Sequence, residues 1–124
     1  MQAKALICDA QQHFTIEEVT FKEVGEGEIL IRTAYSGVSI GTEFALIRNK
    51  ISWGPYPLCT GYMATGIIEE IGAGVEGLEI GDAVYCRGNN TGVMALADGT
   101  KVSCVSGSHA SHIVAQAGGT HGVA

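Results

Sequence analysis

Short apolar segments separated by glycine turns run along most of this chain, at intervals typical of all-β barrels and sandwiches. In several segments apolar and more polar residues alternate, as Val84 and Cys86 do with their neighbours, which is the pattern of a strand with one buried face. The predicted strands are 3–8, 13–21, 28–38, 64–71, 83–87, 101–105 and 111–116. The sequence therefore predicts a mainly β fold.

The second predicted strand, 13–21, changes its hydrophobic phase midway. Phe14 and Ile16 share one face, whereas Val19 and Phe21 share the other. If all four residues are to be buried, an extra residue must shift the register, so this slip predicts a β-bulge.

The next three segments differ in character. Segment 28–38 is a long run rich in β-branched residues that could be buried on both faces, and it is the candidate central strand. Only 42–50 is predicted to be helical, because Thr42 can cap it and apolar residues recur there at helical spacing. Segment 52–60 is predicted to be a loop stiffened by two prolines.

Composition limits the class of protein. A chain of 124 residues with 46% apolar residues suits one folded domain. Seven basic and thirteen acidic residues give a net charge of −6, and the basic residues are scattered, so we expect no nucleic-acid partner and no anionic membrane. No secretory signal or long apolar run is present, so we expect a cytoplasmic protein. The four cysteines lie far apart in sequence, which predicts buried thiols outside any disulfide or zinc knuckle.

One short motif is misleading. Segment 72–77 spells GxGxxG directly after a predicted strand, and Asp98 follows some twenty residues later, as in a dinucleotide-binding fingerprint. That fingerprint needs a helix beginning at the last glycines. Here only three residues separate it from Gly81-Asp82, a turn dipeptide before the next strand. The segment is therefore predicted to be a turn without a phosphate site.

Read as a whole, segment 61–84 (GYMATGIIEEIGAGVEGLEIGDAV) resembles the catalytic domain of the medium-chain dehydrogenases/reductases, the zinc alcohol dehydrogenase superfamily. In that family a glycine-histidine-glutamate opening leads into a strand of small residues, a valine-x-glycine-leucine turn and a glycine-aspartate pair. The matching residues here are Gly61, Gly66, Gly72, Gly74, Val75, Gly77, Leu78, Gly81, Asp82 and Val84. Segment 36–43 (SGVSIGTE) is similar to the family's serine-glycine-isoleucine-cysteine-glycine-threonine-aspartate box. The resemblance extends from Ala3 to about Gln116.

The resemblance implies a partly open GroES-like β-barrel with one or two short helices, occupying 1–124 as a single catalytic, substrate-side domain. In the family a Rossmann domain binds NAD or NADP, and that domain is not present in these residues. We therefore expect a part of a longer NAD(P)-dependent oxidoreductase, inactive by itself, that acts on a small-molecule alcohol, carbonyl or activated double bond. The face that would meet the cofactor domain is apolar, so a homo-oligomer is also possible.

In this sequence, other residues stand at the positions that correspond to the family's zinc ligands. Its cysteine position corresponds to Ser39 or Ile40, depending on the direction of counting, since the box holds one extra residue. Its histidine and glutamate correspond to Tyr62 and Met63. Zinc in proteins is held by thiolate, imidazole or carboxylate. The sequence therefore predicts no metal ligands and a zinc-independent enzyme.

The resemblance also implies which residues carry the chemistry. Thr42 matches the family's proton-relaying hydroxyl, and Tyr62 stands at the vacated histidine position. Either hydroxyl could donate a hydrogen bond to a carbonyl while hydride arrives from the nicotinamide. Structural roles are the alternative: Thr42 as a helix cap and Tyr62 as a filler of the metal cavity. Ser39, Ile40 and Gly41 are the implied cofactor contacts.

Trp53 and Tyr56 on the stiff loop, together with Met63, are candidate walls of a substrate site, and Cys59 could lie near the family's metal position. A small core beneath the loop is the alternative role for these residues.

Two other functions remain open. Zinc could be bound through ligands foreign to the family, as in a polyol, amino-alcohol or threonine-type dehydrogenase. Among the histidines, however, His109 and His112 are three residues apart, which on a strand places them on opposite faces. The adjacent Glu69 and Glu70 likewise point apart and are expected to be solvated. The third possibility is a non-catalytic GroES-like module for binding or oligomerisation.

Overall fold

The computed structural model describes residues 2–38, 41, 55–61, 63–86, 90, 94–104 and 107–122. The elements in chain order are β1 (Gln2–Cys8), β2 (Phe14–Phe21), β3 (Glu28–Gly37), β4 (Leu58–Cys59), β5 (Met63–Ile71), β6 (Ala83–Cys86), β7 (Met94–Leu96), β8 (Ser103–Cys104), β9 (His112–Gln116), the 3₁₀ helix η1 (Ala117–Gly119) and β10 (Thr120–Gly122). The predicted mainly β class is confirmed. The predicted helix 42–50 lies outside the described residues. Among the residues described, no helix has the length and apolar character that crossing a membrane requires.

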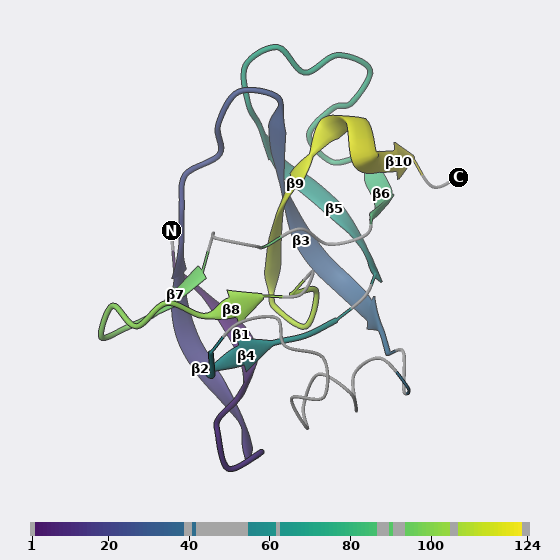
Figure 1. The fold of residues 1–124 in the computed structure, drawn as a ribbon. Coiled ribbons are helices and arrows are strands. Elements are labelled where there is room, and N and C mark those ends of the chain that lie inside the picture. Colours follow the sequence, from purple (N-terminus) through teal and green to yellow (C-terminus); the bar gives the residue numbers. More distant parts are fainter. Residues whose placement is uncertain are drawn as a thin grey trace.

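The described strands form two sheets of five strands each. Their strand orders are β7-β2-β1-β4-β8 and β10-β6-β5-β3-β9. Figure 1 shows how these strands are arranged. Neighbouring strands are antiparallel except β4 and β8, which are parallel. Segment 109–111 joins the sheets, because it bonds to β1 on one side and to β3 on the other: the Ser111 amide donates to the Lys4 carbonyl (2.7 Å), and the Thr33 amide donates to the Ser111 carbonyl (2.9 Å). We call this junction the seam; it closes the two sheets into a half-barrel.

The predicted bulge in β2 is wrong. β2 pairs with β1 in unbroken register from Gln2↔Thr20 to Cys8↔Phe14. Phe14 and Ile16 are 45% and 73% exposed, whereas Val19 and Phe21 are buried. The strand simply alternates, because only its second half covers the core and nothing obliges Phe14 and Ile16 to be buried.

β3 was predicted to be the central strand; it is an interior strand, between β5 and the edge strand β9, and the middle strand of its sheet is β5. Both faces of β3 are buried only along its first four residues, 28–31. Beyond them the strand extends past the core and most of its side chains are exposed. Its pairing with β5 shifts register twice, between Leu30 and Ile31 and between Thr33 and Tyr35.

Several short strands were missed. The predicted loop 52–60 ends in β4, which pairs with both β1 and β8. β7 and β10 were not predicted at all. Strands of two or three residues carry too few alternations to give a pattern, and they exist here because a longer strand offers an unpaired edge.

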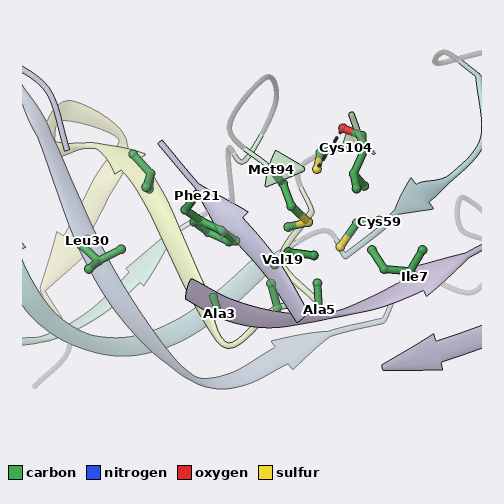
Figure 2. Packing of buried hydrophobic residues seen from close by; sticks show 12 residues of the cluster. Ala3, Ala5, Ile7, Val19, Phe21, Leu30, Cys59, Met94 and Cys104 are labelled. Carbon is green, nitrogen blue, oxygen red and sulfur yellow. Dashed lines mark hydrogen bonds between the residues drawn. The ribbon is translucent and has the colours of Figure 1, made fainter. Parts of the chain in front are cut away.

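The core consists of two clusters that share β3 as a wall, because successive side chains of a strand point to opposite faces. Leu30 points into the first cluster, between the sheets, which Figure 2 shows with Phe21, Met94 and Cys59. Ile29 and Ile31 point into the second. The second cluster also contains Ala64, Ile68, Val84, Cys86, Ile113 and Ala115.

The GxGxxG segment forms a turn, as predicted, and no helix follows it within 72–82. Gly74 and Gly77 have positive φ values of 79° and 82°, a conformation that favours glycine. The Gly72 amide donates to the Glu28 carbonyl at 2.8 Å, so the turn lies against the connection between β2 and β3. Glycine at these positions allows the two chain segments to approach each other closely.

Glu28 is a buried carboxylate at the start of β3, 9% exposed. Its Oε1 accepts a hydrogen bond from the Gly25 amide (2.8 Å), and its Oε2 accepts one from Lys22 Nζ (3.0 Å). These two bonds, that of Gly25 first, lower the pKa of Glu28 below its usual value, against the opposing effect of burial.

A carboxylate with a lowered folded-state pKa stabilises the fold above its unfolded pKa, and this contribution is lost as the pH falls through the folded value. We therefore expect the Glu28 contribution to be complete above about pH 5 and to disappear under acid conditions. Glu28→Gln should cost about 1 kcal/mol at pH 7 and flatten the acid limb of the stability profile. Urea titrations from pH 2.5 to 7 measure this, with the exposed Glu76→Gln as control. Parallel profiles for wild type and Glu28→Gln would contradict the prediction.

The four cysteines are buried and none forms a disulfide, as predicted. Burial raises the pKa of the Cys86 thiol to about 11. Burial, followed by the nearby Asp9 carboxylate, also raises the pKa of Cys8. Because the thiolate is the reactive form, both thiols are doubly protected, by exclusion of the reagent and by protonation.

We expect no fast-reacting thiol when the native chain is mixed with a disulfide reagent at pH 8, and four reactive thiols after unfolding in guanidinium. At that pH about one Cys86 in a thousand is a thiolate. Absorbance at the thiolate product's wavelength counts the reacted groups. A thiol that titrates within seconds without denaturant would contradict the placement of the cysteines.

Candidate functional site

The candidate site lies where β3 ends beside the start of β5. Gly37 and Met63 are paired residues there. A Cβ built on Gly37 would approach Met63 Cγ to 2.7 Å, so the glycine lets the methionine side chain lie directly on the β3 backbone. From β6, the Tyr85 hydroxyl lies 3.9 Å from Met63 Sδ, at the limit of a weak hydrogen bond to a thioether. Gly37, Met63 and Tyr85 are called the Met63 cluster below.

The Met63 cluster carries no formal charge, and both Met63 and Tyr85 are half-buried. Half-buried apolar groups with one phenolic hydroxyl suit an uncharged organic ligand, since they bind apolar surface and orient it through a single polar contact. Gly41 is exposed, and among the described residues an added Cβ there would meet no atom within 4 Å.

The structure describes four of the nine predicted site residues: Gly41, Tyr56, Cys59 and Met63. The others are outside the described residues: Ser39, Ile40, Thr42, Trp53 and Tyr62. The roles of Thr42 and Tyr62 therefore stay predictions, as does the contact of Ser39, Ile40 and Gly41 with a cofactor.

Tyr56 and Cys59 lie in different surroundings. Tyr56 is half-buried just before β4. Cys59, in β4, is 0% exposed and packs in the first core cluster. Its thiol lies 3.8 Å from the carbonyl oxygens of Gly107 and His109. A side chain so enclosed is a core residue, and its position does not support a substrate contact.

The two histidines of 107–116 face separate partners. His109 Nδ1 lies 2.6 Å from Ser36 Oγ. His112 Nδ1 lies 2.9 Å from Ser111 Oγ, and its Nε2 lies 2.9 Å from Glu69 Oε1. Glu69 is exposed, as expected, and β9 in addition brings His112 beside it. Among the described residues, no group of three or more histidine, cysteine, aspartate or glutamate side chains could hold a metal ion.

Asn90 is a structural residue that sequence reasoning missed. It is 0% exposed, and its Nδ2 donates to the carbonyls of Gly107 (3.0 Å) and His112 (3.2 Å). Its Oδ1 accepts from the Val114 amide at 3.0 Å. These bonds fix segment 107–114, which carries His109 and the seam. No local pattern signals such a role, because every partner is at least 17 residues away.

A family model described as the alcohol dehydrogenase GroES-like domain matches residues 25–123. Among curated proteins, the chain is 30% identical over 93 residues to 2-desacetyl-2-hydroxyethyl bacteriochlorophyllide A dehydrogenase of Cereibacter sphaeroides, covering 73% of this chain and 29% of that protein. It is 33% identical over 87 residues to the NDMA-dependent alcohol dehydrogenase of Amycolatopsis methanolica, covering 69% and 23%. The chain thus spans less than a third of the length of these relatives.

Solved structures agree in fold. An alcohol dehydrogenase zinc-binding domain protein from Burkholderia ambifaria superposes with a TM-score of 0.88 at 18% identity, covering 100% of this chain and 42% of that one. A protein named CAD from Helicobacter pylori, complexed with NADP(H), gives 0.78 at 21% identity, covering 99% and 42%. At these identities the likeness concerns the fold alone.

Proposed function

Because the chain belongs to the family of the alcohol dehydrogenase GroES-like domain, we propose that residues 1–124 form the substrate-side domain of an NAD(P)-dependent oxidoreductase. Its substrate is a small alcohol or carbonyl compound, or one with an activated double bond. The relatives named above are dehydrogenases more than three times as long as the matched part. A nicotinamide site of the Rossmann type would belong to another domain, so the 124 residues alone should not turn over substrate.

The proposed enzyme works without zinc at the family's site. The observation that carries this proposal is the Met63 cluster, where the family's glutamate position holds a thioether that lies on Gly37 and faces the Tyr85 hydroxyl. Zinc takes thiolate, imidazole or carboxylate ligands. The serine or isoleucine at 39–40, the phenol of Tyr62 and the thioether of Met63 form a donor set that does not fit zinc. We therefore derive no step through a metal.

In this proposal hydroxyl groups replace the Lewis acid. NAD(P), held mainly by the other domain, would supply or accept the hydride. Thr42 and Tyr62 would donate hydrogen bonds to the substrate oxygen and move its proton. Tyr56 and Met63, with Trp53, would form the apolar wall that orients the substrate and excludes water. Cys59 is left out of this wall because it is enclosed in the core.

The test uses the full-length protein that carries this domain. NAD(P)H oxidation is followed with a panel of aldehydes, ketones and enals. Thr42→Val and Tyr62→Phe should each lower kcat about a hundredfold, the usual range for loss of a positioned proton donor. A zinc chelator should leave the rate unchanged.

Tyr35→Phe is the matched control, because Tyr35 is a highly exposed tyrosine of β3. Its kcat should equal that of the wild type. Loss of activity with chelator and recovery with zinc would overturn the zinc-independent proposal. No turnover with any substrate, together with no binding of NAD(P)H to the full-length protein, would favour a non-catalytic binding module.

A further inference from the structure

An open groove of about 630 Å³ follows the seam between the two sheets. Its floor is formed by β1, by segment 109–111 and by the end of β3, which are joined by the backbone hydrogen bonds described above. The described lining residues on which the argument depends are Lys4, Leu6, Ile16, Thr33, Ser36, Val38 and Ser111. None of the described residues of the Met63 cluster or of the proposed substrate wall lines the seam groove.

The walls of the seam groove are apolar and accessible. Ile16 and Val38 are 73% and 68% exposed and lie on its two sides, from β2 and from just beyond β3. Leu6 pairs with Ile16 across β1 and β2, so their side chains share one face. Large exposed aliphatic side chains that converge on one groove are a surface that can bury an aliphatic or aryl group.

The charged side chain in the described lining of the seam groove is that of Lys4. The chain carries a net charge of −6, yet among the described residues no aspartate or glutamate lines this groove, whereas Lys4 does. Lys4 is exposed and makes no ion pair with the residues that the structure describes. Its neighbour in the register is Glu18, which is the acidic group that competes for it. A ligand carboxylate that binds Lys4 would therefore compete with the nearby Glu18 but would not have to break an existing ion pair.

One hydroxyl of the seam groove has no partner. Thr33 Oγ1 is buried and makes no hydrogen bond within the described part of the chain. Ser36 and Ser111, by contrast, are engaged with His109 and His112. Ser111 lies between Thr33 and Lys4 and is hydrogen-bonded to the backbone of each. A buried donor without an acceptor is unfavourable, so an acceptor supplied by a ligand at this end of the groove would be stabilising.

We propose that the seam groove binds a small amphipathic carboxylate. Its carboxylate lies at Lys4 and the Thr33 hydroxyl, and its apolar body lies between Leu6, Ile16 and Val38. The charge of the lining selects an anion, and the two aliphatic walls select one with a hydrocarbon or aryl part. This site does not depend on the proposed oxidoreductase activity, because neither cofactor nor turnover enters the argument.

Octanoate is the probe, titrated into the full chain by calorimetry and by NMR, with 1-octanol as the uncharged analogue. We expect saturable binding of one octanoate, with shifts at residues 4, 33 and 109–111, and weaker binding of octanol. Lys4→Glu should weaken octanoate binding about tenfold or more. Glu18→Gln should strengthen it, since the competing carboxylate is removed. Thr33→Val should weaken it several-fold.

Lys101→Glu is the matched control: Lys101 is exposed, pairs with Ala95 in an isolated bridge and lies outside the groove. Circular dichroism checks that each variant is folded. If Lys4→Glu and Lys101→Glu weakened octanoate binding equally, the change in net charge alone would explain the effect, and the proposal would be overturned. Equal affinity for octanol and octanoate, or no saturable binding, would overturn it as well.

Discussion

Gly66→Ala should unfold the domain or come close to doing so. Gly66 lies in β5 opposite Thr33, between the two register shifts of the β3–β5 pair. A Cβ there would overlap the Arg32 carbonyl oxygen and would lie 2.6 Å from Ile31 Cγ2. The carbonyl belongs to the backbone of β3, an interior strand, and cannot turn aside, so the two strands would have to separate.

The cost follows from overpacking, which typically amounts to 1–3 kcal/mol and exceeds that range when backbone must move. We expect at least about 3 kcal/mol, a large part of the 5–15 kcal/mol available to a domain. Urea or thermal denaturation measures it. Gly118→Ala is the matched control, since its Cβ meets nothing within 4 Å. Equal stability of the Gly66 and Gly118 variants would show that β3 and β5 do not approach as described.

Asn90→Leu is the second substitution with a large expected effect. Leucine has a similar shape but satisfies none of the three backbone groups that Asn90 bonds, two carbonyls and one amide. Each buried group left without a partner costs about 1–3 kcal/mol, so the variant should lose about 4 kcal/mol. Gln11→Leu, on the exposed turn after β1, is the control and should change stability little.

Asn90→Asp distinguishes lost hydrogen bonds from lost packing. Its carboxylate would face the Gly107 and His112 carbonyls, which repel it, so its folded-state pKa should rise. A raised carboxyl pKa makes the variant most stable at low pH, and its stability falls as the pH rises from the unfolded towards the folded value. Denaturation midpoints from pH 3 to 8 measure this. A pH profile parallel to that of the wild type would contradict the bonding of Asn90.

Much of the fold could be predicted from the sequence because long strands carry their own pattern. The predicted 28–38, 64–71 and 111–116 correspond to β3, β5 and β9: burial alternates along β5, whereas β3 and β9 contain runs of consecutive buried residues. β2 shows the limit of the same reasoning. Its apolar positions were visible, but whether Ile16 is buried depends on which residues pack against it, and the described residues leave it 73% exposed.

The candidate site was predictable only through resemblance. Met63 was chosen because it stands at a family position, and its contact with Tyr85 arises because β5 pairs with β6. Tyr85, Asn90 and the pair of Ser36 with His109 carried no signal along the chain. Their partners lie between 17 and 73 residues away, so only the sheet pairings bring them together.

The sequence by itself determined the mainly β class, the interior strand that became β3, the turn at 72–77 and the burial of the cysteines. Each of these follows from local preferences: alternation, β-branching, glycine conformation and hydrophobicity. Only the tertiary structure decided the short strands, the unbulged β2, the seam and its groove, and the ionic surroundings of Glu28 and Glu69. These depend on which strands become neighbours, and that choice is made by the burial of the whole chain rather than by any segment of it.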